Sequence, residues 1–266
     1  MNSFRMPIVM TVVALLAAPV LTGCKGKTDN MANEGMAKES ETMQAAAPNT
    51  LTQAEKDAGW QLLFDGKTTD GWKGYNKDSF PTKGWHIEDG VLYVEASNTE
   101  EAGFGGDIVT TESFDNFELS LDFMLSDTAN SGILYRVIET DDPIWHNAPE
   151  YQLLDDPTYI AMGTMDMTTH LTGDNYDMQS AMARPLKPVG EWNTARIVVN
   201  GPLVEHWLNG QKMLEYELWS PEWEAQYKAS KFRDYPAYGR TQRGPIGLQD
   251  HGHRVSFRNI KIRPIA

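Results

Sequence analysis

Short β-strand patterns separated by two-residue turns recur along the chain beyond residue 60. Trp85–Glu88 and Val91–Val94 flank the dipeptide Asp89-Gly90, and the same turn chemistry appears at Asn200-Gly201 and Asn209-Gly210. Such dipeptides adopt the positive φ angles of tight hairpin turns, whose twist matches that of paired antiparallel strands. The pattern therefore predicts β-hairpins in which strands adjacent in the sequence pair with each other.

Apolar and polar residues alternate most clearly in Phe117–Phe123, where every second residue is Phe or Leu. This period places the apolar side chains on one face of a strand. Roughly a dozen short strands of this kind follow one another, and only Pro221–Ser230 has helical character. The prediction is an all-β fold, an antiparallel β-sandwich, with long polar loops at 156–190 and 231–244. Structureless loops of this length are usually functional.

The N-terminus has the pattern of a bacterial lipoprotein signal peptide. An apolar run over 8–20, too short to span a membrane, precedes Leu21-Thr22-Gly23-Cys24, which resembles a lipobox. We predict a signal peptide over 1–23, lipidation of Cys24, a flexible polar tether over 24–50 and a single domain over 51–266. The lipid would anchor the domain to a bacterial membrane in a periplasmic or extracytoplasmic location. The alternative is an ordinary secretory signal with a cysteine that is not lipidated.

The charge balance argues against nucleic acid as a partner. The chain carries 23 basic and 37 acidic residues, for a formal net charge of −14, whereas phosphate backbones favour basic surfaces. The single cysteine, Cys24, lies before the domain, so the domain can form neither a disulfide framework nor a thiolate metal site. Eight tryptophans and ten tyrosines supply aromatic faces for sugar stacking, although most should belong to the core.

The stretch Glu150–Asp156 predicts a β-strand that ends in an acidic turn. Successive side chains on a strand point to opposite faces, so Glu150 and Gln152 share one face. Asp155 falls on the other face unless a bulge resets the alternation. A carboxylate and an amide on one rigid strand are suited to substrate binding and proton transfer, and we expect Asp155 to join them in binding substrate.

Side chains from other strands are expected to converge on the same sheet face. Arg136 lies on the preceding strand, and Gln249 and His251 lie near the last strands. A Glu150 carboxylate in an ion pair with Arg136 is the structural alternative to a catalytic carboxylate, and the residues favour neither. Because imidazole titrates near neutrality, His251 is a second candidate for proton transfer.

Histidine and aromatic side chains extend the candidate substrate site. Strand alternation separates His206 from Trp207, so only one of them can face a sugar. With Trp207 in the core, His206 is the expected site residue. Tyr176 and Trp145 flank the polar loops and are candidate stacking platforms, with ordinary packing as the alternative.

No cofactor is predicted. Oxygen and nitrogen ligands for a divalent metal exist in Glu150, Asp155, His206 and His251, but they show no tight ligand spacing, so a metal is kept as an alternative. No strand is followed by a nucleotide-binding glycine motif, so redox chemistry is not expected of this chain.

Motifs from about residue 58 to the C-terminus resemble those of the 3-keto-disaccharide hydrolase family. In chain order, they are Leu63-Phe64-Asp65-Gly66, Gly71-Trp72, Gly105-Gly106-Asp107, Asn130-Ser131-Gly132, Glu150-Tyr151-Gln152-Leu153-Leu154-Asp155, Gly190-Glu191-Trp192-Asn193, His206-Trp207-Leu208-Asn209-Gly210, Gly247-Leu248-Gln249-Asp250-His251-Gly252 and Phe257-Arg258-Asn259-Ile260. The resemblance implies a concanavalin A-like β-sandwich (jelly roll) with lyase-and-hydratase or net hydrolase activity on 3-keto-glycosides. Its partners would be a small carbohydrate substrate and a separate oxidoreductase that makes the ketone.

A ketone at C3 changes how a glycosidic bond breaks. It acidifies the C2 proton, so a base can remove that proton, the C1–O bond breaks by β-elimination, and water then adds to the enone. Glu150 is the candidate base, and His251 is the second candidate acid or base. Arg136 and Gln152 are candidate donors to substrate hydroxyls or to the enolate oxygen. The spacing Glu150-x-Gln152-x-x-Asp155 departs from the Glu-x-Asp-x-x-Glu of retaining sandwich glycosidases, which disfavours direct hydrolysis of unoxidised glycosides. A non-catalytic carbohydrate-binding lipoprotein module is the alternative function.

Overall fold

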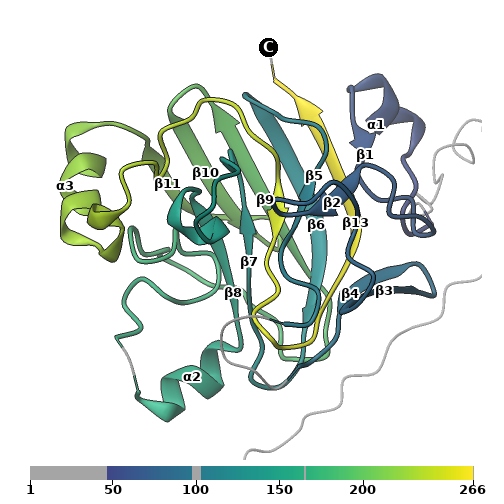
Figure 1. Cartoon of the computed structure of the whole chain (residues 1–266), viewed down its shortest axis with the longest axis horizontal. Coiled ribbons are helices and arrows are strands. Elements are labelled where there is room, and N and C mark those ends of the chain that lie inside the picture. Colours follow the sequence, from purple (N-terminus) through teal and green to yellow (C-terminus); the bar gives the residue numbers. More distant parts are fainter. Residues whose placement is uncertain (1–46, 98–102, 165, 266) are drawn as a thin grey trace, which may run out of the picture. The chain divides into compact units, whose positions relative to one another are not determined.

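The computed structural model describes residues 47–97, 103–164 and 166–265 (Figure 1). The predicted signal peptide, Cys24 and most of the predicted tether lie outside these ranges. None of the helices in the described ranges is long and apolar enough to cross a membrane.

Two antiparallel sheets form the domain. The larger sheet contains, in spatial order, β11 (Gln211–Glu217), β10 (Leu203–Leu208), β9 (Asn193–Asn200), β6 (Phe117–Leu125), β13 (Val255–Pro264), β4 (Val91–Val94) and β3 (Trp85–Glu88), with β1 (Gln61–Leu62) beside β13. The smaller sheet contains, in spatial order, β2 (Trp72–Gly74), β5 (Ile108–Thr110), β12 (Gly247–Leu248), β7 (Asn130–Leu134) and β8 (Glu150–Leu154). The late strands β12 and β13 lie inside the two sheets, between strands from the first half of the chain. The predicted fold class, an all-β jelly-roll sandwich, is confirmed.

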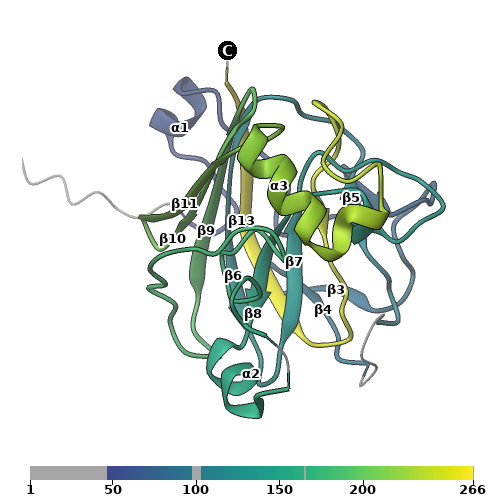
Figure 2. The same ribbon diagram turned by 90° about the vertical axis from the view of Figure 1, so that its left-hand side faces the viewer.

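Helices are short and lie outside the two layers. They are α1 (Gln53–Asp57), α2 (Asp156–Met162) and α3 (Pro221–Ala229), with the 3₁₀ helices η1 (Ile144–His146) and η2 (Lys231–Asp234). In Figure 2, β9, β10 and β11 lie on one side of β7 and β8, and α3 lies in front of them. The predicted helix at Pro221–Ser230 is confirmed as α3, whereas α2 occupies the start of a loop for which no helix was predicted.

The hydrophobic core lies between the sheets. In β6, the side chains of Phe117, Leu119, Leu121 and Phe123 are at most 1% exposed, which confirms the predicted alternation. Burial of each such side chain stabilises the fold by about 1.5–3 kcal/mol. Of the outward residues that alternate with them, Ser120, Asp122 and Met124 stay partly exposed, whereas Glu118 is buried.

Two of the three predicted two-residue turns are also observed. At the third, Asn200 pairs with Leu203, so Gly201 and Pro202 connect β9 to β10 in place of the predicted Asn200-Gly201. Asp89 and Gly90 have φ angles of 50° and 79°, and Asn209 and Gly210 have 49° and 83°. These left-handed values are those of a type I′ turn, which glycine, asparagine and aspartate adopt most readily. The turns join β3 to β4 and β10 to β11, and each pair is antiparallel.

The folded domain begins before the predicted boundary at residue 51. Asn49 is buried, its Nδ2 donates to the Gly90 carbonyl at 2.8 Å, and its Oδ1 accepts from the Asn259 N–H at 2.8 Å. Residues 47–50 therefore belong to the domain rather than to a tether. Thr52 and Glu55 form a capping box at the start of α1.

Candidate active site

Strand β8 presents Glu150 and Gln152 on the outer face of the smaller sheet, away from the core. Tyr151, between them, points inward, and its hydroxyl donates to the Trp207 carbonyl of the larger sheet at 3.1 Å. The predicted alternation is thus observed. Gly132 of β7 pairs with Gln152 in register and belongs to the same outer face.

The carboxylate of Glu150 lies over Gly132. A Cβ atom placed on Gly132 would come within 2.1 Å of Glu150 Oε1, so a residue without a side chain is needed there. Glu150 is only 3% exposed, and no residue within the described ranges donates a hydrogen bond to its carboxylate. Burial raises the pKa of Glu150 to about 8, with Lys231 opposing the rise and Asp107 adding to it. A carboxyl group with this pKa is a strong general base near neutral pH.

Two glutamine side chains flank the carboxylate. The Gln249 N–H donates to the Gly132 carbonyl at 3.0 Å, so Gln249 lies on the side of Gly132 opposite Gln152. Both glutamines are more than nine-tenths buried, and neither Oε1 atom accepts a hydrogen bond from the described part of the chain. Leaving a buried acceptor unsatisfied costs about 1–3 kcal/mol. The two oxygens are therefore suited to accept hydrogen bonds from the hydroxyl groups of a bound ligand.

His251 joins this face through an amide. Gln152 Nε2 donates to Asn130 Oδ1 at 3.0 Å, and Asn130 Nδ2 lies 3.4 Å from His251 Nε2. Asn130 lies two residues from Gly132 on β7 and so shares its face. The structure thus brings Glu150, Gln152, Gln249 and His251 to one face of the smaller sheet, as the sequence predicts.

Asp107, directly before β5, is a further titratable group beside Gln249. Its Oδ1 accepts from the Asp250 N–H at 2.9 Å. Desolvation, together with the charge of Asp250, raises the pKa of Asp107 to about 7. Asp250 itself is anchored by the N–H groups of Gly105 and Gly106, each 3.1 Å from its Oδ2. The sequence analysis missed Asp107 as a site residue, although it belongs to one of the family motifs.

Lys231, the first residue of η2, brings a positive charge to the site. Its Nζ lies 4.4 Å and 4.2 Å from the ring centroids of Trp145 and Tyr176. The Tyr176 N–H donates to the Glu150 carbonyl at 3.1 Å, which ties the aromatic ring to the strand that carries the base. The two predicted platforms therefore meet at a lysine that the sequence analysis did not name. The one sequence feature that pointed to Lys231 was its position in the 231–244 loop, which was predicted to be functional.

Arg136 does not belong to this site. It is 2% exposed, its Nε and Nη2 donate to the Asp115 carbonyl at 3.2 and 2.9 Å, and its Nη2 also donates to the Gly201 carbonyl at 2.9 Å. Strand β7 ends at Leu134, and the φ angle of 52° at Arg136 breaks the alternation. The predicted contact of Arg136 with substrate is wrong, and so is the alternative ion pair with Glu150.

His206 points into the core. It is fully buried, with Nδ1 2.9 Å from the Gly173 carbonyl and Nε2 2.9 Å from the Tyr135 hydroxyl. Burial lowers the pKa of His206 to about 4, so the imidazole is neutral. Trp207 faces outward instead, with the Arg196 guanidinium 4.5 Å from its ring. The predicted orientation of this pair is reversed, because two polar partners between the sheets satisfy the imidazole.

Asp155 lies at the opposite end of β8 from Glu150. Five residues of extended strand separate the two carboxylates by roughly 16 Å. The Asp155 Oδ2 accepts from the Thr128 N–H at 2.9 Å and so fixes the turn between β6 and β7. Its predicted role in substrate binding at the Glu150 site is wrong. The four side chains considered as metal ligands therefore do not gather, and the described ranges contain no group of three or more His, Cys, Asp or Glu suited to a metal.

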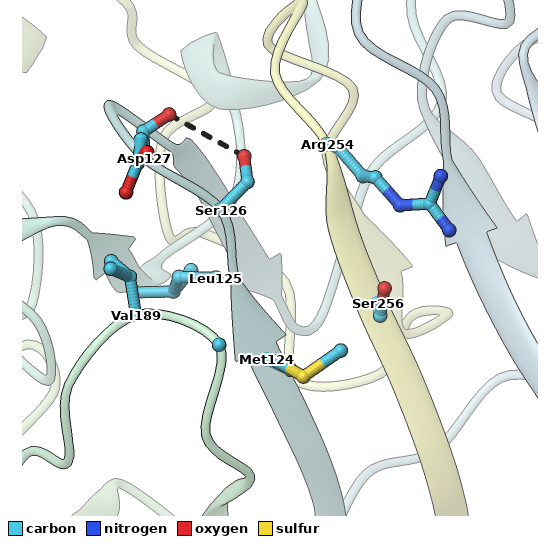
Figure 3. Close-up of a pocket in the computed structure, with 8 residues that line it drawn as sticks. Met124, Leu125, Ser126, Asp127, Val189, Arg254 and Ser256 are labelled. Atoms are coloured by element: carbon cyan, nitrogen blue, oxygen red, sulfur yellow. Dashed lines mark hydrogen bonds between the residues drawn. The ribbon is translucent and has the colours of Figure 1, made fainter.

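A hollow of about 340 Å³ on another part of the surface lacks this chemistry (Figure 3). Met124 at the end of β6, Val189 and Ser256 of β13 line it, together with Arg254. The Arg254 guanidinium is turned to the Tyr93 ring, 3.9 Å from its centroid. The titratable residues that line the hollow, Asp127 and Arg254, are both exposed, whereas Glu150 is a buried carboxyl group, so the Glu150 face is the candidate active site.

Comparison with known proteins shows the family to which the chain belongs. Residues 59–263 match the family described as the 3-keto-alpha-glucoside-1,2-lyase-like domain. The chain is 36% identical over 277 residues to the 3-keto-disaccharide hydrolase of Bacteroides thetaiotaomicron, a match that covers 93% of this chain and 95% of that protein. A crystal structure from Parabacteroides distasonis ATCC 8503, assigned as a glycosyl hydrolase, has a TM-score of 0.74 and 35% identity, covering 83% of this chain and 100% of that one. A second structure from the same organism, with the same assignment, has a TM-score of 0.56 and 30% identity, covering 77% and 99%. The chain therefore belongs to the 3-keto-alpha-glucoside-1,2-lyase-like domain family.

Proposed function

We propose that this protein cleaves the glycosidic bond of 3-keto-glycosides, with Glu150 as the base that removes the C2 proton. The observation that carries the proposal is a buried carboxyl group with a pKa of about 8 and no hydrogen-bond donor from the described chain, on the face of a sheet. Such a group favours the abstraction of a proton from carbon. Membership of the family, and similarity to a protein named 3-keto-disaccharide hydrolase, support the substrate class.

The proposed reaction proceeds in two stages. Glu150 takes the C2 proton, the electrons of the C2–H bond form an enolate on the C3 oxygen, and collapse of the enolate expels the C1 oxygen as an alcohol. Water then adds at C1 of the resulting enone, and C2 regains a proton. The sum is hydrolysis of the glycosidic bond, with no change in oxidation state.

The surrounding side chains supply the other requirements. The Oε1 atoms of Gln152 and Gln249 accept hydrogen bonds from substrate hydroxyl groups and so orient the sugar ring over Glu150. His251, connected to Gln152 through Asn130, is the group that exchanges a proton with the C1 oxygen. No metal or other cofactor is needed for these steps.

Two further parts of the proposal concern the setting of the enzyme. A separate oxidoreductase oxidises the C3 hydroxyl of the glycoside, because the elimination requires the ketone. A lipid on Cys24 anchors the enzyme to a membrane outside the cytoplasm. Mass spectrometry of the mature N-terminus from the native membrane fraction tests the anchor.

A pair of substrates tests the reaction. We expect cleavage of a 3-keto-glucoside and no comparable cleavage of the unoxidised parent glucoside. In D₂O, the released 3-keto-glucose should carry deuterium at C2 from the first turnovers, whereas direct hydrolysis leaves the C2 hydrogen in place. Comparable cleavage of the parent would contradict the elimination mechanism.

The variant Glu150→Gln tests the base. It should lower kcat by about 100-fold or more while the dissociation constant for the 3-keto-glucoside changes little. The matched control is Glu215→Gln on β11, in the larger sheet, which should leave kcat unchanged. Binding of the sugar without turnover in the wild-type protein would support the binding-module alternative, and retained turnover in Glu150→Gln would show that another group is the base.

A further inference from the structure

The proposed reaction needs a cation or hydrogen-bond donor at the C3 oxygen, where negative charge develops. Arg136 was the predicted donor, and the structure places it elsewhere, bound to the carbonyls of Asp115 and Gly201. A positive charge near Glu150 must therefore come from another segment. Lys231 Nζ lies 4.2 Å from the centroid of the Tyr176 ring, and the Tyr176 N–H donates to the Glu150 carbonyl at 3.1 Å, so Lys231 brings a positive charge close to Glu150.

A hydrogen bond holds the backbone of Lys231, and its side chain is exposed. Its N–H donates to Asp177 Oδ2 at 2.8 Å, and Asp177 Oδ1 lies 3.1 Å from His170 Nε2. These contacts fix the start of η2 against the loop that carries Tyr176. The Lys231 side chain is solvent-exposed and borders a hollow of about 320 Å³, so a ligand can reach it.

The ammonium group of Lys231 donates no hydrogen bond to the described part of the chain. Within the described ranges, its Nζ forms no hydrogen bond and no ion pair, and it lies over the faces of Trp145 and Tyr176. Other lysines differ: Lys73 and Lys212 are each paired with a carboxylate. Aromatic faces stabilise a cation without occupying its N–H groups, which leaves all three free to bind an oxygen of a ligand.

The positive charge of Lys231 and the negative charge of Glu150 stabilise each other. Desolvation lowers the pKa of Lys231, while Glu150 and Asp177 oppose that change. In a 3-keto sugar, the C2 hydrogen and the C3 oxygen are on adjacent carbons, so the base and the donor to the oxygen must come from neighbouring groups such as these.

We infer that Lys231 is a catalytic residue that donates a hydrogen bond to the C3 oxygen of the 3-keto sugar and stabilises the enolate formed when Glu150 takes the C2 proton. This inference rests on the proposed function. The Lys231 N–H groups bind the oxygen non-covalently, and the lysine neither gains nor loses a proton overall. Trp145 and Tyr176 hold the ammonium in place.

The test compares Lys231→Met, Lys231→Arg and the control Lys228→Met, an exposed lysine on α3 three residues earlier. Loss of a donor to a developing oxyanion lowers kcat by about 100-fold or more, so this loss is expected for Lys231→Met with little change in KM. Lys231→Arg keeps the charge and should recover part of the rate. Lys228→Met should behave like the wild type. Melting temperatures of all variants establish that they are folded.

The pH profile separates catalysis from a structural role. Lys231 favours the ionised form of Glu150, so Lys231→Met should move the rise of kcat/KM with pH to a higher pH. Exchange of the C2 hydrogen with D₂O should slow to the same extent as kcat.

Three outcomes would overturn the inference. They are an unchanged kcat in Lys231→Met, a loss confined to KM, and a substrate adduct on Lys231 that borohydride traps, because that adduct would show a covalent iminium instead. In each of these cases, wild-type cleavage with C2 exchange and an inactive Glu150→Gln would leave the proposed function intact. Absence of wild-type cleavage would instead refute the proposed function.

Discussion

The Glu150 carboxylate can occupy its position because residue 132 is a glycine and has no side chain there. The carboxylate occupies the space that a Cβ atom there would fill, between Gln152 and Gln249. The backbone of Gly132 lies in an ordinary strand and has no positive φ, so alanine is compatible with the chain conformation. The glycine is therefore required for space rather than for backbone freedom.

Gly132→Ala should lower kcat/KM by about 10-fold or more, because the methyl group displaces the base by about 1 Å or more. The protein should stay folded, with a melting temperature within a few degrees of the wild type. Gly247→Ala on the neighbouring strand is the control, since its methyl group would meet the apolar side chains of Ile144 and Leu134 instead. Equal losses of activity in the two variants would contradict the explanation that glycine at position 132 leaves space for the Glu150 carboxylate.

Among the elements, β8 performs two tasks at its two ends. At its start, Glu150 and Gln152 form the candidate site. At its end, Asp155 accepts from the Thr128 N–H, and α2 begins directly afterwards. Thr128 has a φ angle of 58°, so this hydrogen bond supports a turn in an unfavourable backbone conformation. The acidic end of β8 is thus a structural support for the β6–β7 connection.

Asp155→Ala should lower the free energy of unfolding by about 1–3 kcal/mol, because it leaves the Thr128 N–H without an acceptor. Asp155→Asn keeps an acceptor oxygen and should recover most of that loss. Denaturant titration measures both changes. In both variants, kcat/KM per folded molecule should equal that of the wild type, and a selective loss of sugar binding would instead restore Asp155 to the substrate site.

For the whole molecule, buried titratable groups set how stability depends on pH. Glu150 and Asp107 have folded-state pKa values of about 8 and about 7, above the ordinary values of 4.5 and 3.8. Their contribution to the free energy of unfolding is fully present at a pH below their ordinary pKa values. It is lost as the pH rises through their folded-state pKa values. His206 acts in the opposite direction at low pH: its pKa is lowered from 6.5 to about 4, so its contribution is lost as the pH falls through that range. Above pH 6.5, the carboxyl groups dominate, and stability declines.

Glu150→Gln should therefore be more stable than the wild type at about pH 9, by about 1–3 kcal/mol, because the amide avoids burying a charge. At about pH 5, where the wild-type carboxyl is protonated, the difference should nearly vanish. Denaturant titrations at the two pH values measure this. Glu215→Gln, at an exposed site, should show no such pH dependence, and a Glu150→Gln variant that was less stable at the higher pH would contradict a raised pKa at Glu150.

Most strands, two of the three hairpin turns and the faces of most strand residues could be predicted from the sequence alone, whereas the faces of His206 and Trp207 were predicted the wrong way round. Alternation in β6 and β8 and the Asp-Gly and Asn-Gly turns are local properties of the backbone, and neighbouring residues are enough to specify them. The face shared by Glu150 and Gln152 follows from the same periodicity, and Gln249 and His251 joined it as expected.

The residues that meet from separate segments could be identified only in the folded chain. Arg136 left the site because β7 ends two residues earlier, and His206 entered the core because Tyr135 and Gly173, both more than 30 residues away in the chain, satisfy its two nitrogens. Lys231 reaches Trp145 and Tyr176 across gaps of more than 50 residues. Such contacts depend on where strands end and how loops pack over a sheet, and a periodic pattern contains no information about either.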